Sequence, residues 1–441
     1  MESGASRGTV RHFGQQDNSL DGAIRLTGRF FGTARILIAL IIGLALGGLS
    51  SRMEGNLSAA ASTLLLPVGK LWLDALTMTV VPLVFGLVVT GIMSASATGE
   101  ASAVASRALF WFAFFLVGAC LLSAVVATSL LVWWPMHPLP HVAVAPVGVT
   151  ASTGAQWFDG LIPTNPIKAA AESAIVPIVI FALFFGFAAT RIERRLQEAL
   201  RSFFDAVVQT MLVIVGWILF IAPIGILALA FGAGKRMGAS AIGVLGQYIV
   251  IVAVTCLVTT AVAYGAVAIF GKVSVSRFAR AASPAQAVAF GTQSSLACLP
   301  VMVEAGPALG VSPASAGLVL PLAVSIFRAA SAAANVAVAI YLAHLYAVPL
   351  PVPILVMGAL IAAPVSLAAV GLPAQVSFFA TIGPVCIAMG VPVEMLPLLL
   401  AVETLPDLFR TIGNVTFDLA VTCIAGEKAD ISSYERLDAA P

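Results

Sequence analysis

The chain has 441 residues, of which 60% are hydrophobic and only 10% are charged. A soluble globular domain has about 25% charged residues, so this composition excludes an ordinary soluble protein and predicts an integral membrane protein. The net charge of +2 gives no indication of a nucleic-acid partner, and we expect the lipid bilayer to surround most of the chain.

Apolar runs long enough to cross a bilayer follow one another along most of the chain, at about 20 residues per span. They predict eight helices, at residues 33–52, 65–94, 106–135, 168–190, 203–232, 242–270, 313–345 and 393–426. Lysine and arginine concentrate in the N-terminal arm, in alternate loops and in the C-terminal tail, which predicts that both termini are cytoplasmic. We therefore expect a multi-pass protein of the inner or plasma membrane, with cytoplasmic tails at residues 1–32 and 427–441.

Two further apolar segments do not fit simple spans. Residues 281–303 are almost free of charge, but the polar run Thr292-Gln293-Ser294-Ser295 lies in their middle. Residues 329–393 contain no Asp, Glu, Lys or Arg, yet proline and glycine interrupt them repeatedly. Non-helical backbone at membrane depth survives only where protein or water satisfies it. The two segments therefore predict re-entrant hairpins that flank a site near the midplane, with kinked ordinary helices as the alternative.

A polar stripe runs along the last apolar segment. Its members, four, three, four and four residues apart, are Glu403, Asp407, Arg410, Asn414 and Asp418. At about 100° per residue, all five fall within about 80° of one helix face. A charged group in hydrocarbon costs at least about 2.5–3.5 kcal/mol, so these groups cannot face lipid. They predict an enclosed or water-filled path for a polar solute, with a small anion as the expected substrate.

Motifs for catalysis, metals or cofactors are not visible. The five cysteines are scattered in apolar surroundings without the spacing of a disulfide or metal site. No HExxH, GxSxG or Cys–His pairing indicates an active site, and there is no soluble output domain. We therefore expect no enzyme, no catalytic residues, no metal and no cofactor, and an intramembrane enzyme or sensor is the least favoured alternative.

Several motifs together resemble those of the dicarboxylate/amino acid:cation symporter family, the glutamate transporters. The matching strings are Leu161-Ile-Pro-Thr-Asn-Pro166, Ala222-Pro-Ile-Gly225, the serine-containing run from Thr292 to Pro300, the run from Ser366 to Pro373, and Asp407-Leu-Phe-Arg410-Thr411-Ile-Gly-Asn414-Val-Thr416-Phe-Asp418. The last string is the most specific. The resemblance extends from about residue 30 to 428.

The resemblance implies a substrate site on the last helix. Asp407 would accept the α-ammonium group of an acidic amino acid, and Arg410 would bind its distal carboxylate through two parallel hydrogen bonds. Asn414 and the main chain at Ser294 and Ser295 would bind the α-carboxylate, helped by a helix N-terminus. Thr411 would belong to the same site. The second hairpin would be the external gate, closing through the segment that contains Ser366, Val370 and Gly371.

The seventh helix departs from the family pattern, because the expected N-M-D-G-T reads Phe327-Arg328-Ala329-Ala330-Ser331. Hard cations need oxygen ligands, and neither Phe327 nor Ala329 has a side-chain oxygen. The sequence therefore predicts altered coupling, with H⁺ or Na⁺ left open as the coupling ion. We expect Arg328 to neutralise Asp418, which resembles the family's cation ligand, in place of sodium; the alternatives are that Arg328 faces headgroups or binds substrate.

Two further residues complete the candidate coupling set. Ser331 stands at the threonine of the N-M-D-G-T pattern. Glu403 is a candidate proton carrier, because burial of a carboxylate favours its protonated form, unless it lies in water at the rim. Transport would then be proton-coupled, an exchange or a uniport.

The resemblance also implies an architecture and an assembly. The fold would be an all-α polytopic membrane protein with eight transmembrane helices plus two re-entrant hairpins. Residues 33–275 would hold helices one to six with the scaffold and trimerisation region, and residues 276–426 the transport core. A homotrimer with an elevator motion of that core is expected. The leading function is secondary transport of an acidic amino acid, since Asp407 suits an ammonium group; the alternative is a C4-dicarboxylate or other organic-anion carrier.

Overall fold

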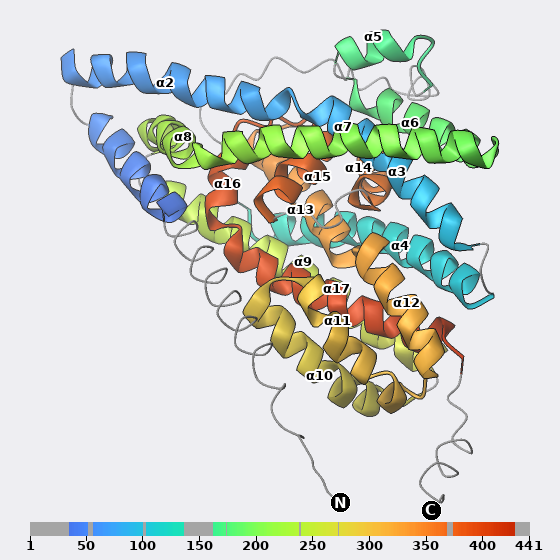
Figure 1. Ribbon diagram of the computed structural model, residues 1–441. Helices are drawn as coiled ribbons and strands as arrows, with labels where there is room; N and C mark the ends of the chain where they lie inside the picture. Colours follow the sequence, from blue (N-terminus) through green and yellow to red (C-terminus); the bar gives the residue numbers. More distant parts are fainter. Residues whose placement is uncertain are drawn as a thin grey trace, which may run out of the picture.

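The computed structural model describes residues 35–51, 56–99, 103–135, 162–172, 174–237, 240–271, 273–367 and 374–427. Within these ranges every regular element is helical (Figure 1). A first helix covers Arg35–Ser50. The others are α2 (Asn56–Thr77), α3 (Val80–Gly99), α4 (Ala103–Trp133), α5 (Pro166–Ala171), α6 (Ile175–Ala189), α7 (Arg194–Phe220), α8 (Ala222–Met237), α9 (Ser240–Phe270), α10 (Val275–Thr292), α11 (Ser295–Glu304), the short 3₁₀ helix η2 (Pro307–Leu309), α12 (Pro313–Ile326), α13 (Ala329–Leu345), α14 (Val352–Leu367), α15 (Ala374–Ala388), α16 (Leu396–Val402) and α17 (Thr404–Ala425).

Six helical stretches of the described chain are long and apolar enough to cross a membrane. They are Ala59–Met93, Ala103–Trp133, Arg194–Phe220, Ser240–Phe270, Pro313–Leu345 and Thr404–Ala425. Further apolar helices are shorter than 18 residues. This pattern agrees with the prediction of an all-helical, multi-pass membrane protein.

Three predicted spans are interrupted close to a proline. The span predicted at 65–94 divides between α2 and α3, before Pro82, and the span predicted at 203–232 divides at Ile221, before Pro223. The span predicted at 393–426 divides into α16 and α17 at Glu403, three residues before Pro406. A proline has no N–H to donate to the carbonyl four residues earlier, so each of these three sites loses one bond of the helical ladder.

The span predicted at 313–345 is broken without a proline or glycine at the break. Phe327 and Arg328 separate α12 from α13, with extended backbone at Phe327 (φ −114°, ψ 112°). The amide of Phe327 still donates to the carbonyl of Ala323 at 2.7 Å, and the amide of Ala332 to the carbonyl of Arg328 at 2.9 Å. The C-terminal end of one half-helix and the N-terminal end of the other therefore meet at the altered family motif.

Two pairs of successive helices pack against each other at the two segments that do not fit simple spans. In the first pair, α10 and α11 are joined by a turn at Gln293, which has a left-handed backbone (φ 51°), and the Ser294 hydroxyl caps α11. In the second pair, α14 packs against α15. The residues that join the second pair, 368–373, lie outside the described ranges.

The centre of the bundle is α13, whose side chains are almost all buried. It packs against α4, α9, α14, α15 and α17. Figure 1 shows α2, α6 and α7 along one edge and α10, α11 and α12 along the opposite edge, with α13 and α17 between them. The polar stripe of α17 therefore lies inside the protein.

Candidate functional site

All five members of the α17 stripe point into the bundle. The exposed fractions of Glu403, Asp407, Arg410, Asn414 and Asp418 are 4%, 7%, 4%, 1% and 0%. Leu405, off this stripe, is exposed. The helical spacing thus placed the stripe correctly, because the one polar face of an otherwise apolar helix packs inward against α9, α10 and α13.

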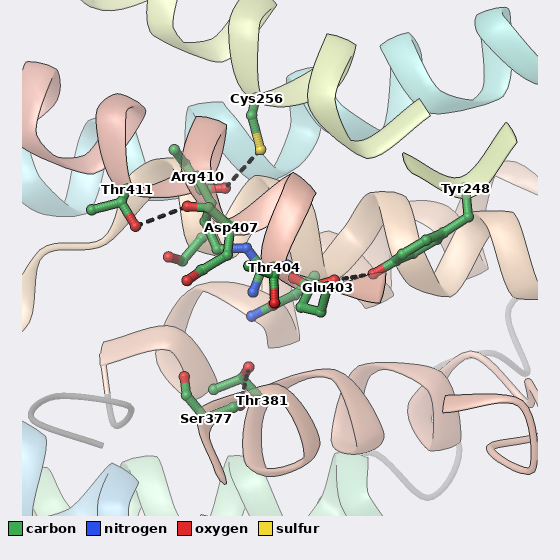
Figure 2. Close-up of polar contacts among 12 residues, drawn as sticks. Tyr248, Cys256, Ser377, Thr381, Glu403, Thr404, Asp407, Arg410 and Thr411 are labelled. Atoms are coloured by element: carbon green, nitrogen blue, oxygen red, sulfur yellow. Dashed lines mark hydrogen bonds and ion pairs between the residues drawn. The ribbon is translucent and has the colours of Figure 1, made fainter. Parts of the chain in front are cut away.

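Arg410 and Glu403 form a close ion pair at the start of α17. Nη2 of Arg410 lies 2.6 Å from Oε1 of Glu403, and the hydroxyl of Tyr248 on α9 donates a hydrogen bond to Oε2 of the same carboxylate (Figure 2). Glu403 therefore does not lie in water at a rim, as one alternative had it. Asp407 also interacts electrostatically with Arg410.

The guanidinium of Arg410 has an N–H group, at Nε, without a hydrogen-bond partner among the described residues. Nη2 contacts the Glu403 carboxylate, whereas Nε makes no hydrogen bond to any described residue. An arginine has five N–H donors in a planar fork, and burial of unsatisfied donors is costly. The free Nε–H group, beside one carboxylate, is a donor that a second carboxylate carried by a ligand would use.

A network of amides and hydroxyls links α17 to α13 and α14. The side chain of Asn414 accepts from the backbone amide of Ser331 at 3.1 Å and donates to the Ser331 hydroxyl at 2.7 Å. One turn along α13, Nδ2 of Asn335 donates to the Ser366 hydroxyl at 3.2 Å, while Oδ1 of Asn335 has no hydrogen-bond partner among the described residues. The structure thus brings Ser331, Asn414 and Ser366 into one buried polar path.

The turn of the first helix pair reaches the same region. Nε2 of Gln293 donates to the backbone carbonyl of Thr404 at 3.1 Å, which joins the turn to the first residue of α17. Ser294 and Ser295, at this turn and at the first residue of α11, are partly exposed. Their amides lie at the positive end of α11, which favours an anion. Val370 and Gly371 lie outside the described residues.

Close backbone packing supports this part of α17. A β-carbon at Gly413 would lie 2.8 Å from the Thr260 hydroxyl oxygen of α9 and 2.5 Å from the β-carbon of Ala330 on α13. Thr411, two residues earlier, donates its hydroxyl to the Asp407 carbonyl at 2.8 Å. Since glycine alone fits at residue 413, α9 and α13 can approach α17 on both sides of the polar stripe.

Asp418 is fully buried, and neither of its carboxylate oxygens has a hydrogen-bond partner among the described residues. Arg328, at the break between α12 and α13, interacts electrostatically with Asp418 and also with Asp407. The neutralisation of Asp418 by Arg328 therefore stays a prediction, and Arg328 interacts with two carboxylates instead of one.

Aromatic rings fill the space around the altered motif. The ring of Phe327 stacks on Phe112 of α4 with centroids 4.6 Å apart and meets Phe417 of α17 edge-on at 6.0 Å. Phe417 also lies against Phe115, at 5.5 Å. Ala329 is fully buried. Apolar rings and a methyl group thus occupy the positions of the two family residues that would supply oxygen.

Four polar residues at the site were not predicted from the sequence. They are Tyr248, Asn335, Ser377 and Thr381, all of them buried. Figure 2 shows Ser377 and Thr381 of α15 on the side of the cluster away from α9. Single polar residues in apolar helices have no distinguishing spacing. Only Tyr248 could have been indicated by a general rule, which is that a buried tyrosine hydroxyl usually has a hydrogen-bond partner.

Comparisons with known proteins cover most of the chain. A family model described as the sodium:dicarboxylate symporter family matches residues 33–428. A proton/glutamate-aspartate symporter of Escherichia coli (strain K12) is 26% identical over 406 residues, 89% of this chain and 91% of the relative. A proton/sodium-glutamate symport protein of Bacillus subtilis (strain 168) is 25% identical, covering 88% and 90%. A C4-dicarboxylate transport protein 3 of Ralstonia nicotianae is 27% identical, covering 92% and 91%.

Proposed function

Because the chain belongs to the sodium:dicarboxylate symporter family, we propose that it carries an acidic amino acid of the size of aspartate or glutamate across the membrane. Membership makes it a multi-pass membrane transporter and not an enzyme, as the sequence predicts. The observation that supports the substrate class most strongly is the buried Arg410, whose Nε has no hydrogen-bond partner among the described residues, three residues from the buried Asp407.

Each polar group of the site has a role in this proposal. Arg410 binds the distal carboxylate through its planar fork, and Asp407 accepts from the α-ammonium group. Asn414 and the amides at Ser294 and Ser295 bind the α-carboxylate. The hydroxyl of Thr411 donates a hydrogen bond to the backbone carbonyl of Asp407 and thereby stabilises this residue. The second helix pair forms the gate, which closes over the substrate through the segment that contains Ser366, Val370 and Gly371; the last two lie outside the described residues.

A C4-dicarboxylate carrier is the second candidate. It is favoured by the relatives named as C4-dicarboxylate transport proteins and by Arg328, a second fixed cation near Asp407. Arg328 would then bind the second carboxylate of a substrate such as succinate. Asp407 argues for the amino acid, because its carboxylate can accept from an ammonium group, which a dicarboxylate lacks.

We also propose that transport does not depend on sodium. A sodium ion needs oxygen ligands, whereas the rings of Phe327, Phe112 and Phe417 occupy the corresponding space. Arg328 supplies a permanent positive charge beside Asp418. The hydroxyl oxygen of Ser331 accepts a hydrogen bond from Nδ2 of Asn414. Transport is then coupled either to protons or to a counter-transported substrate.

The finer architecture belongs to the same proposal. Residues 33–275 form helices one to six with the scaffold, residues 276–426 form a core that moves as an elevator, and α10–α11 and α14–α15 are re-entrant hairpins. Both tails, 1–32 and 427–441, are cytoplasmic, and three copies assemble. The support is the family membership, the charge pattern of the loops and the packing of the two helix pairs.

Competition binding separates the two substrate classes. The purified protein is incubated with labelled L-aspartate and challenged with unlabelled aspartate, glutamate, succinate or malate, with and without sodium. We expect aspartate or glutamate to compete most strongly and sodium to make no difference. Stronger competition by succinate and malate supports the dicarboxylate carrier, and strong sodium dependence refutes sodium independence.

A further inference from the structure

The carboxylate of Glu403 lies where a substrate carboxylate is expected. In the proposed function, Arg410 binds the distal carboxylate of the substrate, and in this structure Nη2 of Arg410 is 2.6 Å from Oε1 of Glu403. Both groups are buried. The chain therefore already supplies an anionic partner for the guanidinium that the substrate has to reach.

We propose that Glu403 is an internal counter-ion that occupies Arg410 in the absence of substrate, and that a proton must neutralise Glu403 before a substrate carboxylate replaces it. This inference rests on the proposed function, because it takes Arg410 as the substrate's carboxylate site. It adds the regulation of that site: a competing carboxylate built into the chain, controlled by one proton.

The balance of charge around Arg410 gives the reason. The charged and titratable groups that face Glu403 are Asp407 and Arg410 on α17, Tyr248 and Cys256 on α9, and, through Arg410 and Asp407, Arg328 between α12 and α13. With Glu403 ionised, the charge of Arg410 is balanced by Glu403, and the charge of Arg328 is shared between Asp407 and Asp418. An incoming carboxylate adds an unbalanced negative charge in a buried site, where like charges repel strongly.

Protonation of Glu403 removes this conflict. The neutral acid loses its charge-assisted interaction with Arg410, and the substrate carboxylate takes over the positive charge. On the other side of the membrane the proton leaves Glu403, the carboxylate returns to Arg410, and the substrate is displaced. One proton enters and leaves with each substrate, so the mechanism is a proton symport without any change of covalent bonds other than O–H.

Tyr248 is the positioning residue of this device. Its hydroxyl holds Oε2 of Glu403, which leaves Oε1 directed at Arg410 (Figure 2). The ring lies 5.7 Å from that of Tyr341, whose own hydroxyl donates to the Val244 carbonyl at 2.6 Å. Because α9 and α13 fix both tyrosines, the carboxylate is held in place from outside α17.

The test is the pH dependence of L-aspartate binding to the purified full-length protein between pH 5 and 8, in wild type and in Glu403→Gln. In wild type, we expect affinity to fall as pH rises, approaching about tenfold per pH unit, the slope for one linked proton. Glu403→Gln has no competing charge, so its affinity should stay near the wild-type value at low pH throughout. In proteoliposomes, this variant should exchange aspartate but lose accumulation driven by a pH gradient.

Control variants make the result specific to the internal pair. Glu304→Gln removes a carboxylate of the same type at an exposed position at the end of α11, and it should keep the wild-type pH profile. Tyr248→Phe should keep the pH dependence but move its midpoint to higher pH, because the hydroxyl favours the charged carboxylate. If Glu403→Gln does not fold, Glu403→Asp provides the second test: a shorter acid should still titrate but compete less with aspartate.

The outcomes separate this inference from the proposed function. If neither aspartate, glutamate, succinate nor malate binds at any pH, the proposed function fails. If a substrate binds and Glu403→Gln keeps both the wild-type pH slope and proton-driven accumulation, the proposed function stands and the internal counter-ion is refuted.

Discussion

Removal of Arg328 tests how the buried acids of the site are neutralised. Asp418 is fully buried, and its two carboxylate oxygens have no hydrogen-bond partner among the described residues, so the charge of Arg328 is its main compensation. Removal of one partner of a buried pair costs about 3–5 kcal/mol. Arg328 is partly exposed, so we expect Arg328→Ala to lower the free energy of unfolding by about 3 kcal/mol, the low end of that range.

A double-mutant cycle measures this interaction. Arg328→Ala, Asp418→Asn and the double variant are unfolded by heat or denaturant in detergent, and the double variant should be more stable than Arg328→Ala, because it no longer contains a stranded carboxylate. A second cycle, with Asp407→Asn in place of Asp418→Asn, measures the interaction energy between Arg328 and Asp407, the other carboxylate that Arg328 faces. If the effects of Arg328→Ala and Asp418→Asn simply add, the two groups are not coupled and the replacement of a cation by Arg328 is refuted.

Three further variants test the substrate site and the ring cluster. Arg410→Lys should weaken aspartate binding at least about tenfold, because a lysine cannot form two parallel bonds to a carboxylate; unchanged affinity in competition binding contradicts this role. Asp407→Asn should weaken binding of aspartate more than that of succinate, which has no ammonium group; equal losses would argue against an ammonium site. Phe327→Ala should cost about 3–5 kcal/mol of unfolding free energy by emptying the space between Phe112 and Phe417. A loss below about 1 kcal/mol would show that these rings do not form a packed core.

The sequence was sufficient for the parts of the molecule that depend on periodicity. The burial cost of charge and the spacing of the stripe place Glu403, Asp407, Arg410, Asn414 and Asp418 inside the bundle, and all five are buried. Apolar run length predicts the six stretches that are long enough to cross a membrane, although Pro82, Pro223 and Pro406 interrupt three predicted spans, and the runs at 33–52 and 168–190 give helices shorter than 18 residues. These features are local along the chain and can be read from it.

The contacts between distant segments could not be read in the same way. Spacing along the helix allows Arg410 to interact with either Glu403 or Asp407, and the contact with Glu403 also involves Tyr248, which is 155 residues away from Glu403 in sequence. The break at Phe327 contains no proline or glycine, and its backbone is extended where aromatic rings from α4 and α17 pack around it. Such choices depend on tertiary packing, which overrides local preference.

Counterflow of labelled L-aspartate into sodium-free proteoliposomes tests whether the polar stripe of α17 forms the substrate path. Vesicles loaded with unlabelled aspartate should take up the label through the wild-type protein, and Arg410→Ala should abolish this uptake while remaining folded. If the Arg410→Ala protein takes up aspartate at the wild-type rate, the buried stripe of α17 is not the substrate path, and the account is wrong.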